Sequence, residues 1–398
     1  SSRHLASRMA RLGTENAFTV LNEVQRLRAA GRDIVSLGIG DPDFDTPEHI
    51  RAAAVEALAR GRTHYGPPAG TPELRRAVAE HLRATRGVEY TPEDIVITPG
   101  AKPILFHALM ALCEGGDEVV FTTPAFPIYE SVARFAGAEP VPLLLPEERD
   151  FRLDPDRLRQ TVGPRTRLII LNSPNNPTGG VLSREDLEAV AEAAIRADAW
   201  VLADEIYSRF LFEGEHHSIV QVPGMKERTI LLDGFSKTYA MTGWRLGYGA
   251  MPAELAAQLA NLNTNTVSCT ATFIQDAGVA ALQGPQEPVR AMIDEFRGRR
   301  DLAIAALNRI PGVTCRMPRG AFYAFPNVTD LCRLRGLESA EQLQHALLHD
   351  AGVATLARSC FGERVPGEEG EYLRLSFATS RQLLEEGIRR IHHWAQGG

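Results

Sequence analysis

The sequence predicts an α/β fold in which a mostly parallel sheet is covered by helices on both faces, together with a smaller α+β unit toward the C-terminus. Strand-like and helix-like segments alternate through the middle of the chain, as they do in such folds. The strand-like segments are continuous apolar runs without the in/out alternation of a half-solvated sheet, which indicates burial on both faces. The 398 residues suffice for one large core and a second smaller one.

The first predicted element is a helix over residues 18–27. Phe18, Leu21, Val24 and Leu27 fall on one face of it, and Gly31 follows its last turn. A single short helix with one apolar stripe buries that stripe only against another part of the molecule. We therefore expect this N-terminal arm to pack against residues far away in the sequence.

Two further helices are predicted from their start signals. Thr46-Pro47-Glu48 and Thr71-Pro72-Glu73 each place a capping hydroxyl before a proline at the first helical position, and Gly61 marks the end of the first of these helices. The predicted strands that follow are 119–121, 141–145, 168–171, 200–203, 229–232 and 246–251. From about Arg290 onward, long helical patterns surround two short strand candidates, 321–325 and 373–377.

Composition and charge exclude several classes of protein. With 43 Lys and Arg against 50 Asp and Glu, the net charge of −7 argues against a nucleic-acid partner, which requires a basic surface. The five cysteines form no C-x-x-C pair and indicate reduced thiols of a cytosolic protein, with neither a disulfide framework nor a zinc site. No apolar run approaches the ~18 residues of a membrane span, and the polar start lacks a signal peptide. We expect a cytoplasmic protein without a membrane partner.

Several familiar motifs are incomplete. The segment 38–41, Gly-Ile-Gly-Asp, lacks the third glycine of a dinucleotide-binding loop; no P-loop is present, and 234–238 lacks the last glycine of a nucleophile elbow. His345 and His349 are four residues apart, but no H-E-x-x-H glutamate lies between them. We interpret these histidines, and the pairs at 216–217 and 392–393, as structural, and we predict no metal site.

Polar residues follow the predicted strands at the edge where parallel sheets bind ligands. Residues 172–179 form a rigid turn with amide side chains, 204–207 read Asp-Glu-Ile-Tyr, and 233–237 end on Lys237. Before them, residues 98–102 open a helix whose free N–H groups favour an anion. Each segment alone is ordinary, because an aspartate after a strand is usually a cap. Together they predict one binding site at this edge.

At this point the sequence resembles a known family. The segment 234–247 resembles the lysine signature of the class I/II pyridoxal-phosphate aminotransferases. Its sequence is GFSKTYAMTGWRLG, and it is preceded, as in that family, by Asn-Pro-Thr-Gly at 176–179 and by Asp204-x-x-Tyr207. Segments 40–44, 65–67 and 373–377 resemble the branch with bacterial and archaeal aspartate and aromatic aminotransferases, so the resemblance covers nearly the whole chain. It implies pyridoxal-phosphate-dependent transferase fold type I, with a mostly parallel seven-stranded sheet and a smaller α+β domain built from both termini. The implied boundaries are 1–45 for the arm and part of the small domain, 46–289 for the large domain, and 290–398 for the C-terminal small domain.

The resemblance implies roles for the residues that contact the ring of pyridoxal 5′-phosphate. Lys237 holds the cofactor covalently and later carries the substrate proton, which makes it the main catalytic residue. Asp204 keeps the pyridine nitrogen protonated, and Tyr207 and Asn176 donate hydrogen bonds to the ring oxygen. Phe126 covers one face of the ring.

Further implied contacts concern the phosphate and the substrate. The phosphate is expected on the backbone of Ala101 and Lys102, with Ser236, Arg245 and, from a second subunit, Tyr65. The substrate carboxylate is assigned to Arg374, with Asn176 and the N–H of Gly40 assisting, because a guanidinium matches a carboxylate with two hydrogen bonds. Position 234 is glycine where relatives often carry serine, which leaves one hydroxyl contact to the phosphate in doubt.

The function implied is a homodimeric aminotransferase with shared active sites, which moves an amino group from an α-amino acid to a 2-oxo acid by ping-pong chemistry, with 2-oxoglutarate and glutamate as one pair. C–S β-lyases and cyclopropane-forming synthases remain alternatives, because they use the same lysine, aspartate and arginine. A regulator with a degenerate domain of this kind requires a DNA-binding module before the arm, and only about a dozen residues precede Thr14.

Substrate choice is not fixed by the sequence. The resemblance places Glu15, in the arm segment 14–16, and Arg358 near the substrate side chain. We expect Glu15 to neutralise Arg358, because an unpaired arginine beside the apolar ring of Phe126 is costly to desolvate. Aromatic and aliphatic donors then compete well with acidic ones. If Arg358 faces the pocket without a partner, it favours acidic donors instead. If its side chain points to solvent, it plays no part in substrate selection.

Overall fold

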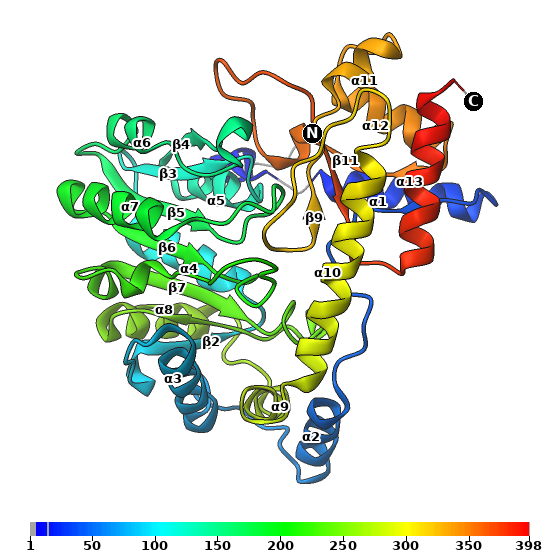
Figure 1. The fold of residues 1–398 in the computed structure, drawn as a ribbon. Coiled ribbons are helices and arrows are strands. Elements are labelled where there is room, and N and C mark those ends of the chain that lie inside the picture. The colour runs from blue at the N-terminus through cyan, green and yellow to red at the C-terminus, as the bar shows by residue number, and fades with distance from the viewer. Residues whose placement is uncertain (1–4, 14–15, 398) are drawn as a thin grey trace.

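A central sheet organises the computed structural model, which describes residues 5–13 and 16–397 (Figure 1). Within these residues a seven-stranded sheet has the order β2-β8-β7-β6-β5-β3-β4. β8 runs antiparallel to both of its neighbours, and β3 to β7 are parallel to one another, which confirms the predicted fold class. The strands of this sheet are β2 (Ile95–Thr98), β3 (Glu118–Thr123), β4 (Glu139–Leu144), β5 (Thr166–Asn172), β6 (Trp200–Asp204), β7 (Thr229–Gly234) and β8 (Gly247–Ala250).

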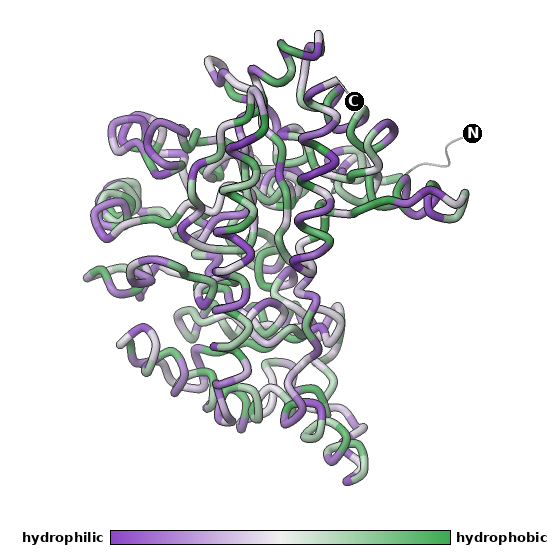
Figure 2. The backbone as a smooth tube through the Cα atoms, turned by 45° about the vertical axis from the view of Figure 1, so that its right-hand side comes forward, coloured by the Kyte–Doolittle hydropathy of each residue, from purple (hydrophilic) through white to green (hydrophobic). Residues whose placement is uncertain are grey.

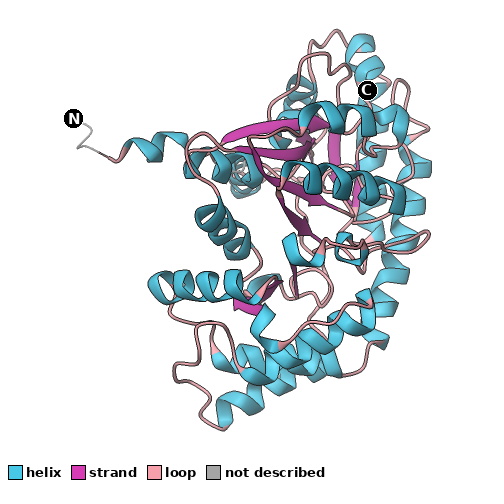
Figure 3. Ribbon diagram, turned by 90° about the vertical axis from the view of Figure 1, so that its left-hand side faces the viewer, coloured by secondary structure: helices cyan, strands magenta, loops and turns pink. Residues whose placement is uncertain are grey.

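Helices cover both faces of this sheet (Figure 3). Along β5, Leu168 and Ile170 pack into a cluster with residues of α4, α5 and α8, whereas Ile169 and Leu171 pack on the opposite face with residues of α3, α6 and α7. Successive side chains of a strand point to opposite faces, so a continuous apolar run is what two covered faces require. The helices concerned are α3 (Pro72–Arg86), α4 (Lys102–Leu112), α5 (Ile128–Ala136), α6 (Pro155–Thr161), α7 (Arg184–Ala197) and α8 (Ala253–Thr266).

Hydrophilic and hydrophobic residues alternate along the outer helices, which thus present one face to solvent and one to the core (Figure 2). The remaining helices are α1 (Ala17–Ala29), α2 (Glu48–Ala59), α9 (Thr272–Gln283), α10 (Glu287–Leu307), α11 (Thr329–Leu334), α12 (Ala340–His349) and α13 (Arg381–Ala395). In the part of the chain just described, no helix is both long and apolar enough to cross a membrane.

The two helix starts predicted from Thr-Pro-Glu behave differently. Thr71 caps α3, where its hydroxyl oxygen accepts a hydrogen bond from the backbone N–H of Leu74. Thr46 does not cap α2, and that prediction was wrong. Its hydroxyl instead donates to the carbonyl of Ala240 at 2.6 Å and accepts from Trp244 Nε1 at 3.0 Å. A tertiary contact to the segment after Lys237 thus replaces the local cap.

Both ends of the chain contribute to two small sheets. β1 (Val35–Ser36) pairs in parallel with β10 (Val353–Ala354), and β12 (Leu373–Ser376) lies between β11 (Leu356–Ala357) and β9 (Tyr323–Ala324). α10 runs from the side of α9 to the side of these small sheets (Figure 1). The two strand candidates of the C-terminal part are confirmed as β9 and β12, and the domain boundaries after residues 45 and 289 stay a prediction.

Candidate functional site

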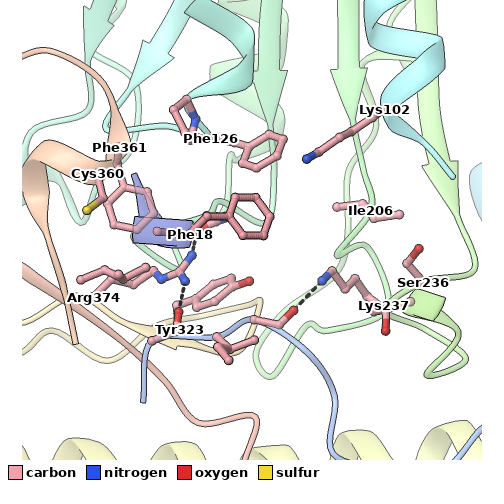
Figure 4. A pocket seen from close by; sticks show the side chains of 18 of the residues that line it. Phe18, Lys102, Phe126, Ile206, Ser236, Lys237, Tyr323, Cys360, Phe361 and Arg374 are labelled. Atoms are coloured by element: carbon pink, nitrogen blue, oxygen red, sulfur yellow. Dashed lines mark hydrogen bonds between the residues drawn. The ribbon is translucent and has the colours of Figure 1, made fainter. Parts of the chain in front are cut away.

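A cavity of about 430 Å³ lies at the carboxyl edge of the sheet, between the strand ends, α1 and the small sheets (Figure 4). The parallel strands β5, β6 and β7 end here side by side, and the turns that follow them carry the polar residues singled out in the sequence. The predicted site residues that line it are Gly40, Ala101, Lys102, Phe126, Asn176, Asp204, Tyr207, Ser236, Lys237, Arg245 and Arg374. Tyr65 is not among the lining residues and its side chain is 88% exposed.

Lys237 reaches the centre of this pocket from the turn after β7. Its Nζ donates a hydrogen bond to the carbonyl of Gly40 at 2.5 Å and lies 5.7 Å from the ring centroid of Phe322. Burial, together with the nearby cations Arg374 and Arg245, lowers the pKa of Lys237 to about 8. The amine therefore loses its proton, and becomes nucleophilic, at a much lower pH than an ordinary lysine does.

Asp204, the last residue of β6, is buried beside the pocket. Its Oδ2 accepts a hydrogen bond from the phenol of Tyr129 at 2.5 Å, and its Oδ1 accepts from the backbone N–H of Ile206 at 3.2 Å. Burial raises the pKa of Asp204 to about 6, against the lowering effect of these hydrogen bonds. A cationic partner in the pocket would stabilise the charged carboxylate.

Two tyrosines meet in the pocket, and one of them contacts the loop that holds Gly40. The hydroxyls of Tyr207 and Tyr323 lie 2.8 Å apart, and burial raises the pKa of Tyr207 well above its ordinary value, so its phenol is a hydrogen-bond donor in the pocket. A Cβ at position 40 would overlap the Tyr323 hydroxyl, so only glycine lets the backbone approach this closely.

Arg374 lies on β12 at the other end of the pocket. It donates to Asn176 Oδ1 at 2.8 Å and to the carbonyl of Gly38 at 2.6 Å, and its guanidinium stacks over the ring of Tyr323 at 4.2 Å. Its Nε is buried without a protein partner. A buried donor without a partner is costly, so this atom favours an anionic ligand.

The start of α4 forms the third polar part of the pocket. Ala101 is the N-cap residue of α4, and Gly100 before it has a left-handed backbone with φ of 80°. A Cβ at Gly100 would overlap Nη2 of Arg245, so the glycine brings the guanidinium next to the helix N-terminus. Ser236 lines the same pocket. Free N–H groups, a hydroxyl and a guanidinium together suit a phosphate.

The remaining wall is apolar. Phe126 lies beside Lys102, whose Nζ is 5.0 Å from the ring centroid, and Phe18 and Phe361 point into the same part of the pocket (Figure 4). Leu21 of α1 also lines the pocket. Val24 and Leu27 of α1 pack in a buried cluster with Leu348 and Ala354, which confirms that the N-terminal helix packs against distant residues. Phe18 remains 54% exposed, so α1 borders the entrance to the pocket.

Arg358 neither lines the pocket nor points to solvent, and its charge pairs with a residue other than Glu15, which corrects all three sequence-based interpretations of this residue. Its side chain is fully buried and pairs with Glu368, with Nε to Oε1 at 2.6 Å and Nη2 to Oε2 at 2.9 Å. It also donates to the carbonyls of Phe361 and Gly362. The arginine thus fixes the backbone of the loop that supports Phe361. The proposed partner Glu15 lies outside the described residues, as does Thr14.

Replacing Arg358 by methionine should lower the free energy of unfolding by about 3–5 kcal/mol, because it leaves Glu368 charged and buried without its cationic partner. Selectivity between aspartate and phenylalanine should change less than threefold. Urea denaturation measures the free energy of unfolding, and kcat/KM for both donors measures the selectivity. Arg60→Ala, which breaks an exposed ion pair with Glu56, is the control. A selective loss of tenfold or more for aspartate would contradict this role.

Sequence reasoning missed several residues of the site. Tyr129 in α5 lies three positions after Phe126, which precedes the helix, and the two rings meet edge to face with centroids 5.7 Å apart. Its nearness to Phe126 in the sequence was the available signal. Asn172, the last residue of β5, belongs to the turn at 172–179 that the sequence indicated, but it was given no role. Its side chain accepts from the backbone N–H of Asn176 at 2.9 Å and donates to the carbonyl of Asp204 at 3.1 Å. Tyr323 had no signal, since only the fold brings β9 next to the Gly40 loop.

Comparison with known proteins identifies the family. Residues 32–391 match the family model described as aminotransferase class I and II. The chain belongs to this family. The aminotransferase is 42% identical to the aspartate aminotransferase of Pyrococcus abyssi over 368 residues, which are 91% of this chain and 92% of that protein.

Solved structures agree with this assignment. The aspartate aminotransferase of Rhizobium meliloti superposes with a TM-score of 0.93 at 35% identity and covers 99% of both chains. The aromatic aminotransferase of Pyrococcus horikoshii gives a TM-score of 0.87 at 40% identity, over 94% of this chain and 99% of that one. The fold is therefore the fold type I expected from the sequence. The aminotransferase moves an amino group from an α-amino acid to a 2-oxo acid, and the lyase and synthase alternatives are not favoured.

Proposed function

We propose that this aminotransferase binds pyridoxal 5′-phosphate at Lys237 and transfers the amino group of aspartate to 2-oxoglutarate in a homodimer. The observation that carries the proposal is the buried amine of Lys237, which lies in one pocket with the carboxylate of Asp204 and the guanidinium of Arg374. The names of its relatives, which include aspartate aminotransferases, support the same substrate class.

The chemistry of the pocket fits the cofactor group by group. Lys237 offers an amine for its aldehyde, Asp204 a carboxylate for its ring nitrogen, and Tyr207 a phenol for its ring oxygen. Arg245 and the N-terminus of α4 offer positive charge and N–H groups for its phosphate. When bound, pyridoxal phosphate acts as an electron sink that lowers the pKa of the substrate Cα–H.

Lys237 is the residue proposed to move the proton. Because burial lowers the pKa of Lys237 to about 8, its Nζ can be neutral and accept the proton from the substrate Cα, and afterwards return it as an acid. Asp204, held by Tyr129, keeps a negative charge at the far side of the ring. Phe126 excludes water from one side of the pocket.

Arg374 is proposed to bind the α-carboxylate of the substrate. Its stacking on Tyr323 and its hydrogen bond to Asn176 hold the guanidinium plane fixed before substrate arrives, which reduces the entropic cost of binding. The apolar wall of Phe18, Leu21 and Phe361 would contact the substrate side chain. Such a wall also admits aromatic donors, in line with the aromatic aminotransferase among the structural relatives.

Lys102 is proposed to select acidic substrates. Among the residues that the structure describes, the cationic side chains that line the pocket are Lys102, Lys237, Arg245 and Arg374. With the other three assigned to the cofactor and the α-carboxylate, the ammonium of Lys102 above the Phe126 ring is the charge that would meet a distal carboxylate. A charge-assisted hydrogen bond of this kind contributes ~1.5–3 kcal/mol.

A half-reaction with a single donor tests function and selectivity together. With aspartate as the only substrate, the loaded enzyme should release about one equivalent of oxaloacetate per site and neither ammonia nor pyruvate. Lys102→Met should lower the second-order rate constant of this half-reaction with aspartate by at least about tenfold. The same rate constant with phenylalanine should stay within threefold of the wild-type value. Release of ammonia would contradict transamination. A weaker affinity for the cofactor, with unchanged selectivity, would reassign Lys102 to the phosphate.

A second subunit is proposed to complete each site. Tyr65 is an aromatic side chain that is 88% exposed and lies outside its own pocket, and residues such as Val55 and Leu58 of α2 are also exposed. Large exposed apolar side chains in one region favour an interface between proteins. The family resemblance places the Tyr65 hydroxyl at the phosphate of the other subunit.

Mixing two inactive or weakened variants tests the shared site. Heterodimers of Tyr65→Phe with Lys237→Ala should contain one site with wild-type residues, formed by Lys237 of the first subunit and Tyr65 of the second. The affinity of that site for pyridoxal phosphate should equal that of the wild type, as measured by fluorescence titration. If mixing restores nothing, or if the protein sediments as an active monomer, the shared site is wrong.

A further inference from the structure

A buried ion cluster lies behind the strand ends that carry the site. Arg86, the last residue of α3, donates from Nε to Glu205 Oε2 at 2.8 Å and from Nη2 to Asp233 Oδ2 at 3.2 Å. The Arg86 side chain is 3% exposed and both carboxylates are 5% exposed. None of the three residues lines the pocket, so nothing proposed for the reaction uses them.

Further hydrogen bonds hold the two carboxylates in place. Glu205 accepts from the hydroxyl of Ser218 and lies 3.1 Å from His216 Nε2. Asp233 accepts from the hydroxyl of Ser208 at 3.3 Å and, through Oδ1, from the N–H of Gly234 at 2.7 Å. A buried charge cluster is stable only when its polar atoms are satisfied in this way.

Each carboxylate is joined by the backbone to a residue of the site. Glu205 directly follows Asp204, and Asp233 precedes the turn that carries Ser236 and Lys237. The N–H of Glu205 also donates to the carbonyl of Leu232 on β7 at 2.8 Å. A displacement of Glu205 therefore also displaces the end of β6, and a displacement of Asp233 displaces the end of β7. The pocket residues are attached to these same strand ends.

The pKa values of Glu205 and Asp233 indicate that the positive charge of Arg86 is needed to keep the two carboxylates close together. Burial alone would raise the pKa of Glu205, but Arg86 and His216 lower it to about 2. Burial raises the pKa of Asp233 to about 7 even though Arg86 lowers it. Without the guanidinium, two carboxylates and the neighbouring Asp204 would repel one another in a buried space.

We propose that Arg86 is a positioning residue for the cofactor: by holding Glu205 and Asp233 together, it fixes the ends of β6 and β7 that present Asp204, Ser236 and Lys237. Arg86 also ends α3, where the carbonyl end of a helix favours a cation, so its own position is defined. The inference rests on the proposed binding of pyridoxal phosphate at Lys237.

The test compares cofactor affinity with fold stability in the same variants. Pyridoxal phosphate is titrated into cofactor-free protein to measure its dissociation constant, and the melting temperature of the cofactor-free protein is recorded. Both are measured for the wild type, Arg86→Gln, Arg86→Lys and Asp233→Asn. Arg300→Gln is the matched control, because Arg300 is 6% exposed in its side chain and pairs with Glu213 and Asp301, neither of which lines the pocket.

The proposal predicts a tenfold or greater rise in the dissociation constant for Arg86→Gln, a smaller rise for Arg86→Lys, and a change within twofold for Arg300→Gln. If Arg86→Gln does not fold, a tenfold or greater rise in the dissociation constant of Asp233→Asn is the test instead. Asparagine has the size of aspartate and keeps a side-chain oxygen that accepts from the N–H of Gly234. Affinities within twofold of wild type, or equal losses in the Arg300 control, would overturn the proposal. A wild-type protein that does not bind the cofactor at Lys237 would overturn the proposed function as well.

Discussion

Replacing Lys237 by alanine is expected to lower kcat for transamination by about 10⁴-fold or more. The variant loses both the amine proposed to hold the cofactor and the base proposed to move the Cα proton, and proton transfer by a positioned side chain alone contributes 10²–10⁴-fold. Steady-state kinetics with aspartate and 2-oxoglutarate measure the loss.

The same variant should still bind pyridoxal phosphate noncovalently. Asp204, Arg245 and the N-terminus of α4 remain in place, so dialysis should remove the cofactor slowly rather than at once. Lys226 offers a control, because its Nζ lies 5.1 Å from the ring centroid of Tyr90 and it does not line the pocket. Lys226→Ala should keep wild-type rates. Retained turnover in Lys237→Ala would contradict the assignment.

Replacing Arg374 by alanine is expected to lower kcat/KM by about 10²- to 10⁴-fold for every α-amino acid, whatever its side chain. Two charge-assisted hydrogen bonds to the α-carboxylate, each contributing ~1.5–3 kcal/mol, are lost together. The loss should be common to aspartate and phenylalanine, since both carry the same carboxylate.

The control for this variant is the cofactor itself. Arg374→Ala should bind pyridoxal phosphate with an affinity within threefold of the wild type, and Arg374→Lys should restore only part of kcat/KM, because an ammonium cannot form the two parallel hydrogen bonds of a guanidinium. A loss confined to acidic donors would instead assign Arg374 to the distal carboxylate.

The sequence predicted those parts of the site that depend on local pattern. Asp204 and Lys237 follow apolar runs that were recognisable as buried strands, and Asn176 follows the run that became β5. Parallel strands end at one edge, so their convergence followed from the fold class. The antiparallel direction of β8 was not predicted, because an apolar run has the same pattern in either direction.

Features that depend on tertiary contacts were missed or assigned wrongly. Arg358 was placed near the substrate, whereas its partner Glu368 lies ten residues further along a loop that no periodicity describes. Thr46 had the pattern of a helix cap but donates to Ala240, almost two hundred residues away. The Arg86 cluster joins a helix end to two strand ends, and a charged residue at a helix terminus is by itself an ordinary surface pattern.

The central claim is that Lys237 is the residue that holds the cofactor, and reduction with borohydride followed by peptide mapping tests it directly. The chain contains three lysines, Lys102, Lys226 and Lys237, so the outcomes are few. The account predicts one phosphopyridoxyl group per chain, on the peptide that contains Lys237, and none on the other two lysines. A label on Lys102 or Lys226, or no label on wild-type protein saturated with pyridoxal phosphate, would contradict it.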